Sequence, residues 1–203
     1  MPRRVCMFPA FFLEKKGILL MEQERKMKQK LTTRNMIMAA FFLALGMVLP
    51  FFTGQIPAVG SMLLPMHIPV LICGYVCGWP WGLLVGFVLP LLRSATIGMP
   101  PMMPTAAAMA FELAAYGAVT GLLYHRMEKT ITSLYISLIG AMIAGRILWG
   151  LVSMVLYGMM GNAFSFQIFL SGALLKAVPG ILVQLVLIPP VIAALQKAKI
   201  VSK

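Results

Sequence analysis

Apolar stretches of roughly 20 residues follow one another from residue 33 to residue 195, with short breaks rich in Gly and Pro between them. Each stretch is long enough to cross the hydrocarbon layer of a membrane as a helix. Hydrophobic residues make up 61% of the chain, charged residues make up 11%, and the mean hydropathy is +0.93. These values exclude a soluble enzyme, a disordered chain and a disulfide-rich secreted domain. The sequence predicts an all-α integral membrane protein.

Six membrane-spanning helices fit the segment that follows the polar N-terminus. Their predicted ranges are 33–53, 62–78, 80–97, 104–124, 132–157 and 169–195. The second and third spans are short, and the tight break Gly78-Trp79-Pro80 separates them. We therefore expect residues 31–203 to form one six-helix membrane domain.

Residues 1–30 form a basic tail outside this domain. The apolar run 5–13 is too short to span a membrane, and no small-residue cleavage site follows it, which argues against a signal peptide. One interpretation is a mis-assigned start, because residues 14–17 have the sequence that a purine-rich ribosome-binding site would encode. The true start would then be Met21 or Met27. The alternative is a basic amphipathic tail that lies on anionic lipid.

Lys and Arg gather before and at the start of the first span, between the fourth and fifth spans, and after the sixth span. The connections after the first, third and fifth spans contain neither residue. With six spans, all the basic clusters lie on one side of the membrane, which the positive-inside rule assigns to the cytoplasm. We expect a multi-pass protein of the plasma membrane with both termini in the cytoplasm. The net charge of +12 reflects this topology rather than nucleic-acid binding.

Four ionisable residues lie inside the predicted spans, where a charged group is costly and therefore indicates function. Arg93, Glu112, Arg146 and Lys176 all fall in the outer half or near the midplane, and His67 opens the second span on the same side. Positive charge exceeds negative charge in this set, so a pocket containing it would favour an anionic ligand. Glu112 and Arg146 have similar predicted depths. They could form an ion pair that fixes two helices, or they could contact the ligand.

The chain lacks residues that other mechanisms require. All five acidic residues are Glu, so a Ser-His-Asp triad cannot form, and no His/Glu cluster suits a metal ion. No P-loop is present, so we expect ATP to be used by partner subunits and no cofactor to be bound by this chain. Two other hypotheses are an autonomous small-solute membrane transporter and a lipid-modifying membrane enzyme that uses His67 or Glu112.

Small residues spaced four apart predict where membrane helices approach closely. Span one has Ala40 and Ala44 on a helix otherwise covered mainly with Met, Phe and Leu. This groove could accept a helix of the same chain or of another subunit. The remaining sets are interpreted as contacts within the bundle, and they comprise Ala106, Ala110, Ala114 and Ala118, together with the pairs Gly74/Gly78, Gly82/Gly86 and Gly117/Gly121.

Several segments resemble a known family. The sequence LLPMHIPVLICGYVCGWPWGLLVGFVLPLLRS at 63–94, followed by GMPPMMPTAAAMAFELAAYGAVTGLLY at 98–124, resembles the substrate-specific S component of energy-coupling factor (ECF) vitamin transporters. It is most similar to the subgroup that includes riboflavin, folate and pantothenate carriers. The runs at 144–150 and 169–190 are similar to the last two helices of that family. The resemblance covers nearly all of 31–203 and identifies no individual vitamin.

The resemblance implies a six-helix S-component fold, with a transmembrane coupling subunit and two ABC ATPase subunits as partners. It also implies that Ala40 and Ala44, which match the family's alanine motif, dock against the coupling subunit. We expect a non-enzymatic substrate-binding subunit that captures a vitamin or related small anionic micronutrient outside the cell and topples in the membrane to deliver it. The expected substrate-binding residues, from the resemblance and the charge argument together, are Glu112, Arg146, Asn162, Lys176, Arg93 and His67.

Overall fold

The structure is a computed structural model that describes residues 32–53, 64–128, 130–160 and 178–198. Within these ranges the regular secondary structure is entirely helical and contains no strand. The chain divides into two compact units, Met1–Ile37 and Met38–Lys203. The helices that carry the expected site all belong to the second unit.

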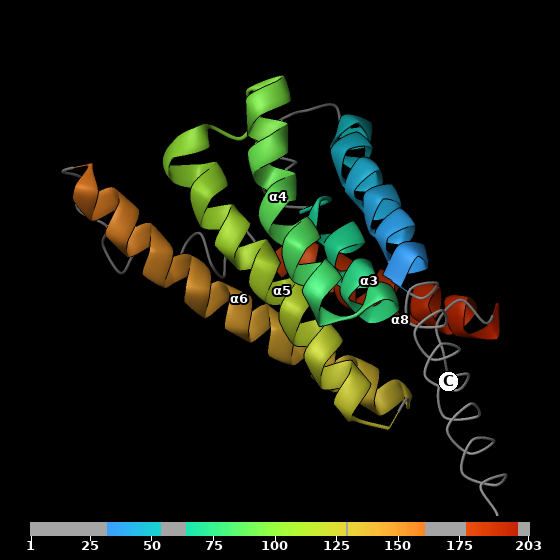
Figure 1. Cartoon of the computed structure of the whole chain (residues 1–203). Coiled ribbons are helices and arrows are strands. Elements are labelled where there is room, and N and C mark those ends of the chain that lie inside the picture. The colour runs from blue at the N-terminus through green and yellow to red at the C-terminus, as the bar shows by residue number, and fades with distance from the viewer. Residues whose placement is uncertain (1–31, 54–63, 129, 161–177, 199–203) are drawn as a thin grey trace, which may run out of the picture. The chain divides into compact units, whose positions relative to one another are not determined.

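Five of the described helices are long and apolar enough to cross a membrane (Figure 1). Where the described residues include the ends of the predicted spans, the two sets of limits agree to within two residues. The predicted residues 169–177 of the sixth span lie outside the described residues. The five helices are Thr32–Phe52, whose end overlaps the 3-10 turn η1 (Leu49–Thr53); α4 (Trp79–Ile97); Met102–Arg126, comprising the π-helical turn η2 (Met102–Ala106) and α5 (Ala107–Arg126); α6 (Ile131–Met159); and α8 (Val178–Lys197).

The predicted second span is shorter than expected, and the count of six membrane-length helices is not confirmed. The helix α3 (His67–Cys77) has 11 residues. At about 1.5 Å per residue it is roughly 16 Å long, well short of a hydrocarbon core of about 30 Å. It ends because Gly78 adopts a φ of 89°, a conformation that favours glycine. The helix α4 then begins at Trp79, with Pro80 in its first turn, as the predicted break required.

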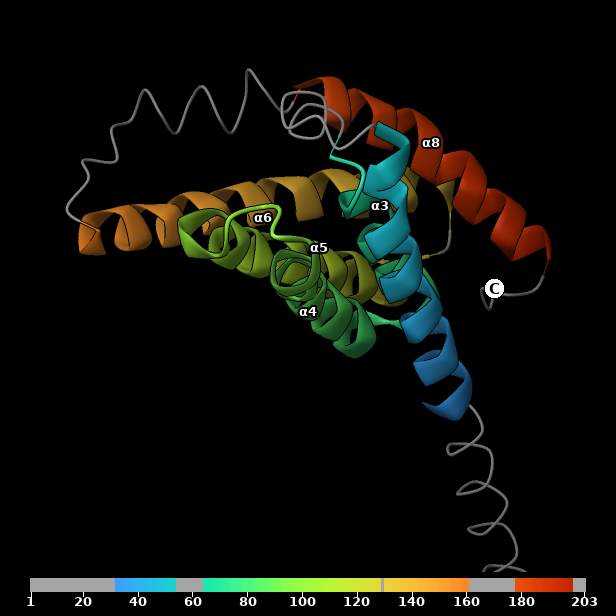
Figure 2. The same ribbon diagram turned by 90° about the horizontal axis from the view of Figure 1, so that it is seen from above.

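The helix α5 contacts α3, α4 and α6, which surround it in the bundle (Figure 2). Its close approach to α4 depends on glycine. A Cβ atom added to Gly117 would lie 2.1 Å from the carbonyl oxygen of Gly82. One added to Gly86 would lie 2.3 Å from the carbonyl oxygen of Leu113. These glycines therefore pack the helices of this chain together, as the small-residue spacing predicted.

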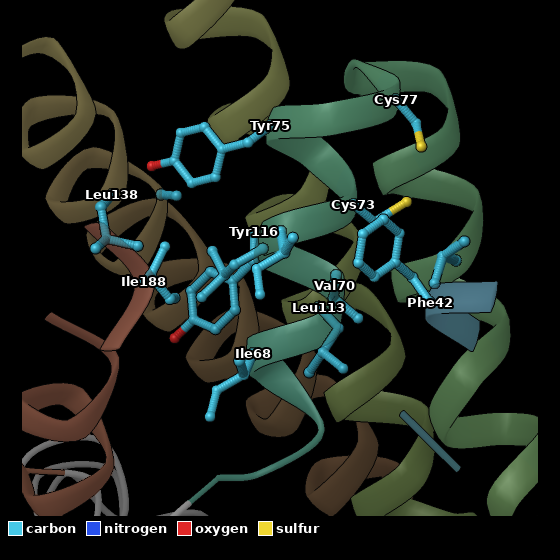
Figure 3. Packing of buried hydrophobic residues seen from close by; sticks show 14 of the residues in the cluster. Phe42, Ile68, Val70, Cys73, Tyr75, Cys77, Leu113, Tyr116, Leu138 and Ile188 are labelled. Carbon is cyan, nitrogen blue, oxygen red and sulfur yellow. The ribbon is translucent and has the colours of Figure 1, made fainter. Parts of the chain in front are cut away.

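The short helix α3 lies in the middle of the core, and nearly all of its residues are buried. Figure 3 shows members of this core from α3, α5, α6 and α8, together with Phe42 of the helix Thr32–Phe52. The helix α8 contacts α3 and α6 and presents a buried face at four-residue spacing, formed by Gln184, Ile188 and Ile192. Both Cys73 and Cys77 are buried within this apolar packing.

Candidate functional site: a buried polar cluster

A single carboxylate oxygen gathers polar side chains from three helices. Glu112 lies on α5 with 2% of its surface exposed. Its Oε1 atom lies 3.1 Å from Nη1 of Arg146 on α6 and accepts a hydrogen bond of 3.0 Å from the hydroxyl of Tyr116. Nε2 of His67, the first residue of α3, lies 3.7 Å from the same oxygen. The ion pair between Glu112 and Arg146, left open by the sequence, is therefore present.

Tyr116 on α5 and Gly145 on α6 bring the side chains of this cluster close together. Tyr116 lies four residues after Glu112, so the two side chains share one face of α5. Its ring also packs against the imidazole of His67, with centroids 5.2 Å apart. On α6, a Cβ added to Gly145 would lie 2.3 Å from Cε1 of the Tyr116 ring. Glycine before Arg146 thus lets the ring of Tyr116 approach the α6 backbone.

Several polar atoms in this part of the core have no hydrogen-bond partner among the described residues. They are Nε and Nη2 of Arg146, both ring nitrogens of His67, and Nε2 of Gln184. A buried polar group without a partner costs free energy, and such groups in native proteins usually bind a ligand or ordered water. The arginine and glutamine nitrogens are donors, whereas a neutral imidazole supplies one donor and one acceptor. The cluster therefore offers mainly N–H groups.

Gln184 and Gln196 both lie on α8. The side-chain amide of Gln196 donates a hydrogen bond to the hydroxyl of Tyr124 on α5. Gln184 lies on the buried face of α8, the helix that contacts α3 and α6. It is 1% exposed.

A second polar cluster surrounds Tyr124 at the other end of α5. Its ring packs edge-on against Tyr75 of α3, with centroids 5.0 Å apart. The Tyr75 hydroxyl lies 2.9 Å from the hydroxyl of Ser137 and donates to the carbonyl oxygen of Leu134 on α6. Together with the hydrogen bond from Gln196, these interactions join α3, α5, α6 and α8 near the C-terminal end of α5.

Arg93 is buried but is not among the residues found to contact Glu112. Its Nη1 atom donates a hydrogen bond of 2.8 Å to the carbonyl oxygen of Met47, near the end of the first helix. Its guanidinium also lies over the ring of Phe51, 5.5 Å from the centroid. Arg93 thus links α4 to the helix Thr32–Phe52. It satisfies a carbonyl group in the last turns of that helix, where a cation is favourable.

The remaining expected residues do not all lie within the described ranges. Asn162 and Lys176 lie outside the described residues. Ala40 and Ala44 are exposed on the helix Thr32–Phe52, whereas Ala39 is buried. Among the residues that the structure describes, no group of three or more His, Cys, Asp or Glu side chains comes together to hold a metal ion.

Sequence reasoning from charge did not identify Tyr116 and Gln184. Both side chains are uncharged, so a search for intramembrane ionisable residues passes over them. The four-residue spacing of Glu112 and Tyr116 was a usable signal for one of them. For the other, the signal was a lone polar residue in the apolar run ILVQLVLIPP at 181–190.

A family model for the ECF transporter substrate-specific component matches residues 34–192, which is most of the chain. The chain belongs to this family. The match includes α3 to α6, and therefore His67, Glu112, Tyr116 and Arg146, as well as Gln184 of α8. Membership assigns the chain to the multi-pass membrane subunits of a transporter rather than to enzymes. Neither a curated protein nor a solved structure gives a significant match.

Proposed function

We propose that this ECF substrate-specific component binds a vitamin or a related small, anionic micronutrient at the outer side of the plasma membrane. A transmembrane coupling subunit and two ABC ATPase subunits would then drive its delivery to the cytoplasm. The observation that carries this proposal is the buried Glu112 cluster, in which several N–H groups lack partners among the described residues. A soluble nutrient with acceptor oxygens would satisfy them.

The proposed orientation places this cluster in the outer half of the bundle. The basic residues in the last turns of α5 and α8 lie at the opposite end of these helices, where the positive-inside rule puts the cytoplasm. In this arrangement the short α3 takes the place of the second of six spans. Asn162 and Lys176 are proposed to complete the pocket from the outer segment between α6 and α8.

The helix Thr32–Phe52 supplies the proposed docking surface for the coupling subunit. Its buried face, which includes Ala39 and Phe42, packs into the core of this chain. Ala40 and Ala44 lie exposed, one helical turn apart, and their small side chains would let a partner helix approach the backbone. The family's partnership with an energising module supports this assignment.

Reconstitution tests the proposal directly. The chain is placed in liposomes with and without the coupling and ATPase subunits, and uptake of a mixture of labelled water-soluble vitamins is measured. We expect ATP-dependent uptake of one compound from the complete complex and none from the chain on its own. Uptake without the ATPases would instead indicate an autonomous transporter, and turnover of the liposome lipids would indicate an enzyme. Mass spectrometry of molecules that co-purify with the chain identifies the ligand independently.

A further inference from the structure

Arg146 has one hydrogen-bonding edge that Glu112 does not use. Its Nη1 atom pairs with the carboxylate, whereas Nε and Nη2 are buried and have no partner in the described part of the chain. In a guanidinium group the Nε–H and Nη2–H bonds point in the same direction from one edge. Two parallel donors of this kind match the two oxygens of a carboxylate.

We infer that Arg146 binds a carboxylate group of the transported molecule through this Nε–Nη2 edge. Glu112 then acts as a positioning residue, which holds Nη1 from the side opposite the ligand. The inference rests on the proposed function and specifies its substrate class as a small carboxylic acid.

The contacts of Glu112 explain why the edge is pre-oriented. Its Oε1 atom is already shared by Arg146, Tyr116 and His67 at 3.1, 3.0 and 3.7 Å. Oε1 therefore has little capacity left for a ligand. Arg146 is held by this contact and retains two donors that can bind a further group.

The other unpaired atoms favour the same ligand class. Nε2 of Gln184 is a further buried donor without a partner in the described part of the chain, and the imidazole of His67 beside Glu112 supplies at least one more. A ligand that fills the cluster must therefore supply mainly acceptor oxygens, beginning with the two of its carboxylate. A cationic ligand would be repelled by the positive charge of the Arg146 guanidinium and could not accept its hydrogen bonds.

The test compares acids with their neutral counterparts on the purified full chain in lipid nanodiscs. The probe pairs are nicotinate and nicotinamide, biotin and biotinamide, pantothenate and pantothenol, and acetate and acetamide at high concentration. Binding is followed by calorimetry and by the thermal shift of the protein. We expect at least one acid to bind tenfold or more tightly than its neutral partner. Absence of any acid preference across the four pairs would overturn the inference.

Four variants test whether the preference for acids depends on Arg146. R146K keeps the charge without the planar edge, so the acid preference should fall about tenfold. The double variant E112Q/R146Q removes both charges without leaving a buried carboxylate unpaired, and it should lose the preference. E112Q keeps a side-chain oxygen that can accept a hydrogen bond from Nη1 and removes one negative charge from the cluster, so it should keep or strengthen the preference. R126Q removes an exposed guanidinium at the far end of α5 and is the matched control.

The result separates this inference from the proposed function. An unchanged acid preference in E112Q/R146Q, or its loss in R126Q, would place the carboxylate elsewhere. ATP-dependent uptake of a neutral compound by the whole complex would refute the carboxylate site and leave the transport function intact. Acid binding by a chain that never assembles with an energising module would support the carboxylate site and refute the proposed transport function.

Discussion

Glu112 joins Arg146, Tyr116 and His67 in one buried polar cluster. Its carboxylate compensates the charge of Arg146 and accepts a hydrogen bond from the Tyr116 hydroxyl, and it is itself only 2% exposed. Removal of one partner from a buried ion pair leaves the other charge uncompensated, which costs more than the loss of a neutral contact. Loss of the Glu112 carboxylate and loss of the Tyr116 hydroxyl should therefore differ in their effect on stability.

We expect Glu112→Ala to lower the free energy of unfolding by up to about 3–5 kcal/mol, because the guanidinium of Arg146, whose side chain is 14% exposed, is left without its counterion. Tyr116→Phe keeps the ring against Gly145 and loses one hydrogen bond to a charged group, so we expect a loss of about 1.5–3 kcal/mol. Thermal and denaturant unfolding in detergent measure both variants. Equal stability of Glu112→Ala and the wild type would show that the ion pair contributes nothing to folding.

At the scale of the helices, glycine rather than side-chain volume sets the distance between α4 and α5. Gly82 and Gly117 face each other so closely that their backbones are in direct contact. In a membrane, lipid tails are as apolar as leucine, so helices gain stability from such close packing rather than from leaving water.

Gly117→Ala should destabilise the protein by about 1–3 kcal/mol, because the new Cβ meets the backbone of α4 rather than a side chain that can move. Gly158→Ala on α6 is the matched control, since nothing lies within 4 Å of its Cβ position. Alanine there should be neutral or stabilise the helix by up to about 1 kcal/mol. Similar melting temperatures for the two variants would contradict the packing argument.

At the scale of the whole molecule, the proposed ligand site and the proposed docking surface lie on different parts of the chain. The polar cluster lies between α3, α5 and α6, whereas Ala40 and Ala44 lie exposed on the first helix. A change to the exposed alanines should therefore affect assembly with a partner without altering the ligand site.

Ala40→Trp should abolish ATP-dependent uptake by the reconstituted complex while leaving ligand affinity of the isolated chain unchanged. The bulky indole would keep a partner helix away from the backbone. Ile143→Trp, at an exposed apolar position on α6, is the matched control and should transport normally. Normal uptake by Ala40→Trp would remove the docking role from this helix.

The sequence by itself determined the helical membrane class, the approximate limits of the long helices and the small-residue packing. These properties follow from hydropathy and residue size along one segment, which need no knowledge of its neighbours. It also indicated Glu112, Arg146 and His67, because charge inside an apolar run stands out locally.

Only the tertiary structure decided which of those residues meet. Arg93 and Arg146 look alike in sequence, yet one binds the carbonyl oxygen of Met47 and the other binds Glu112. The start of α3 at His67, five residues after the predicted start of the second span, was likewise not visible in hydropathy. Pairing depends on the rotation and depth of each helix relative to its neighbours, and these are set by contacts between residues far apart in the chain.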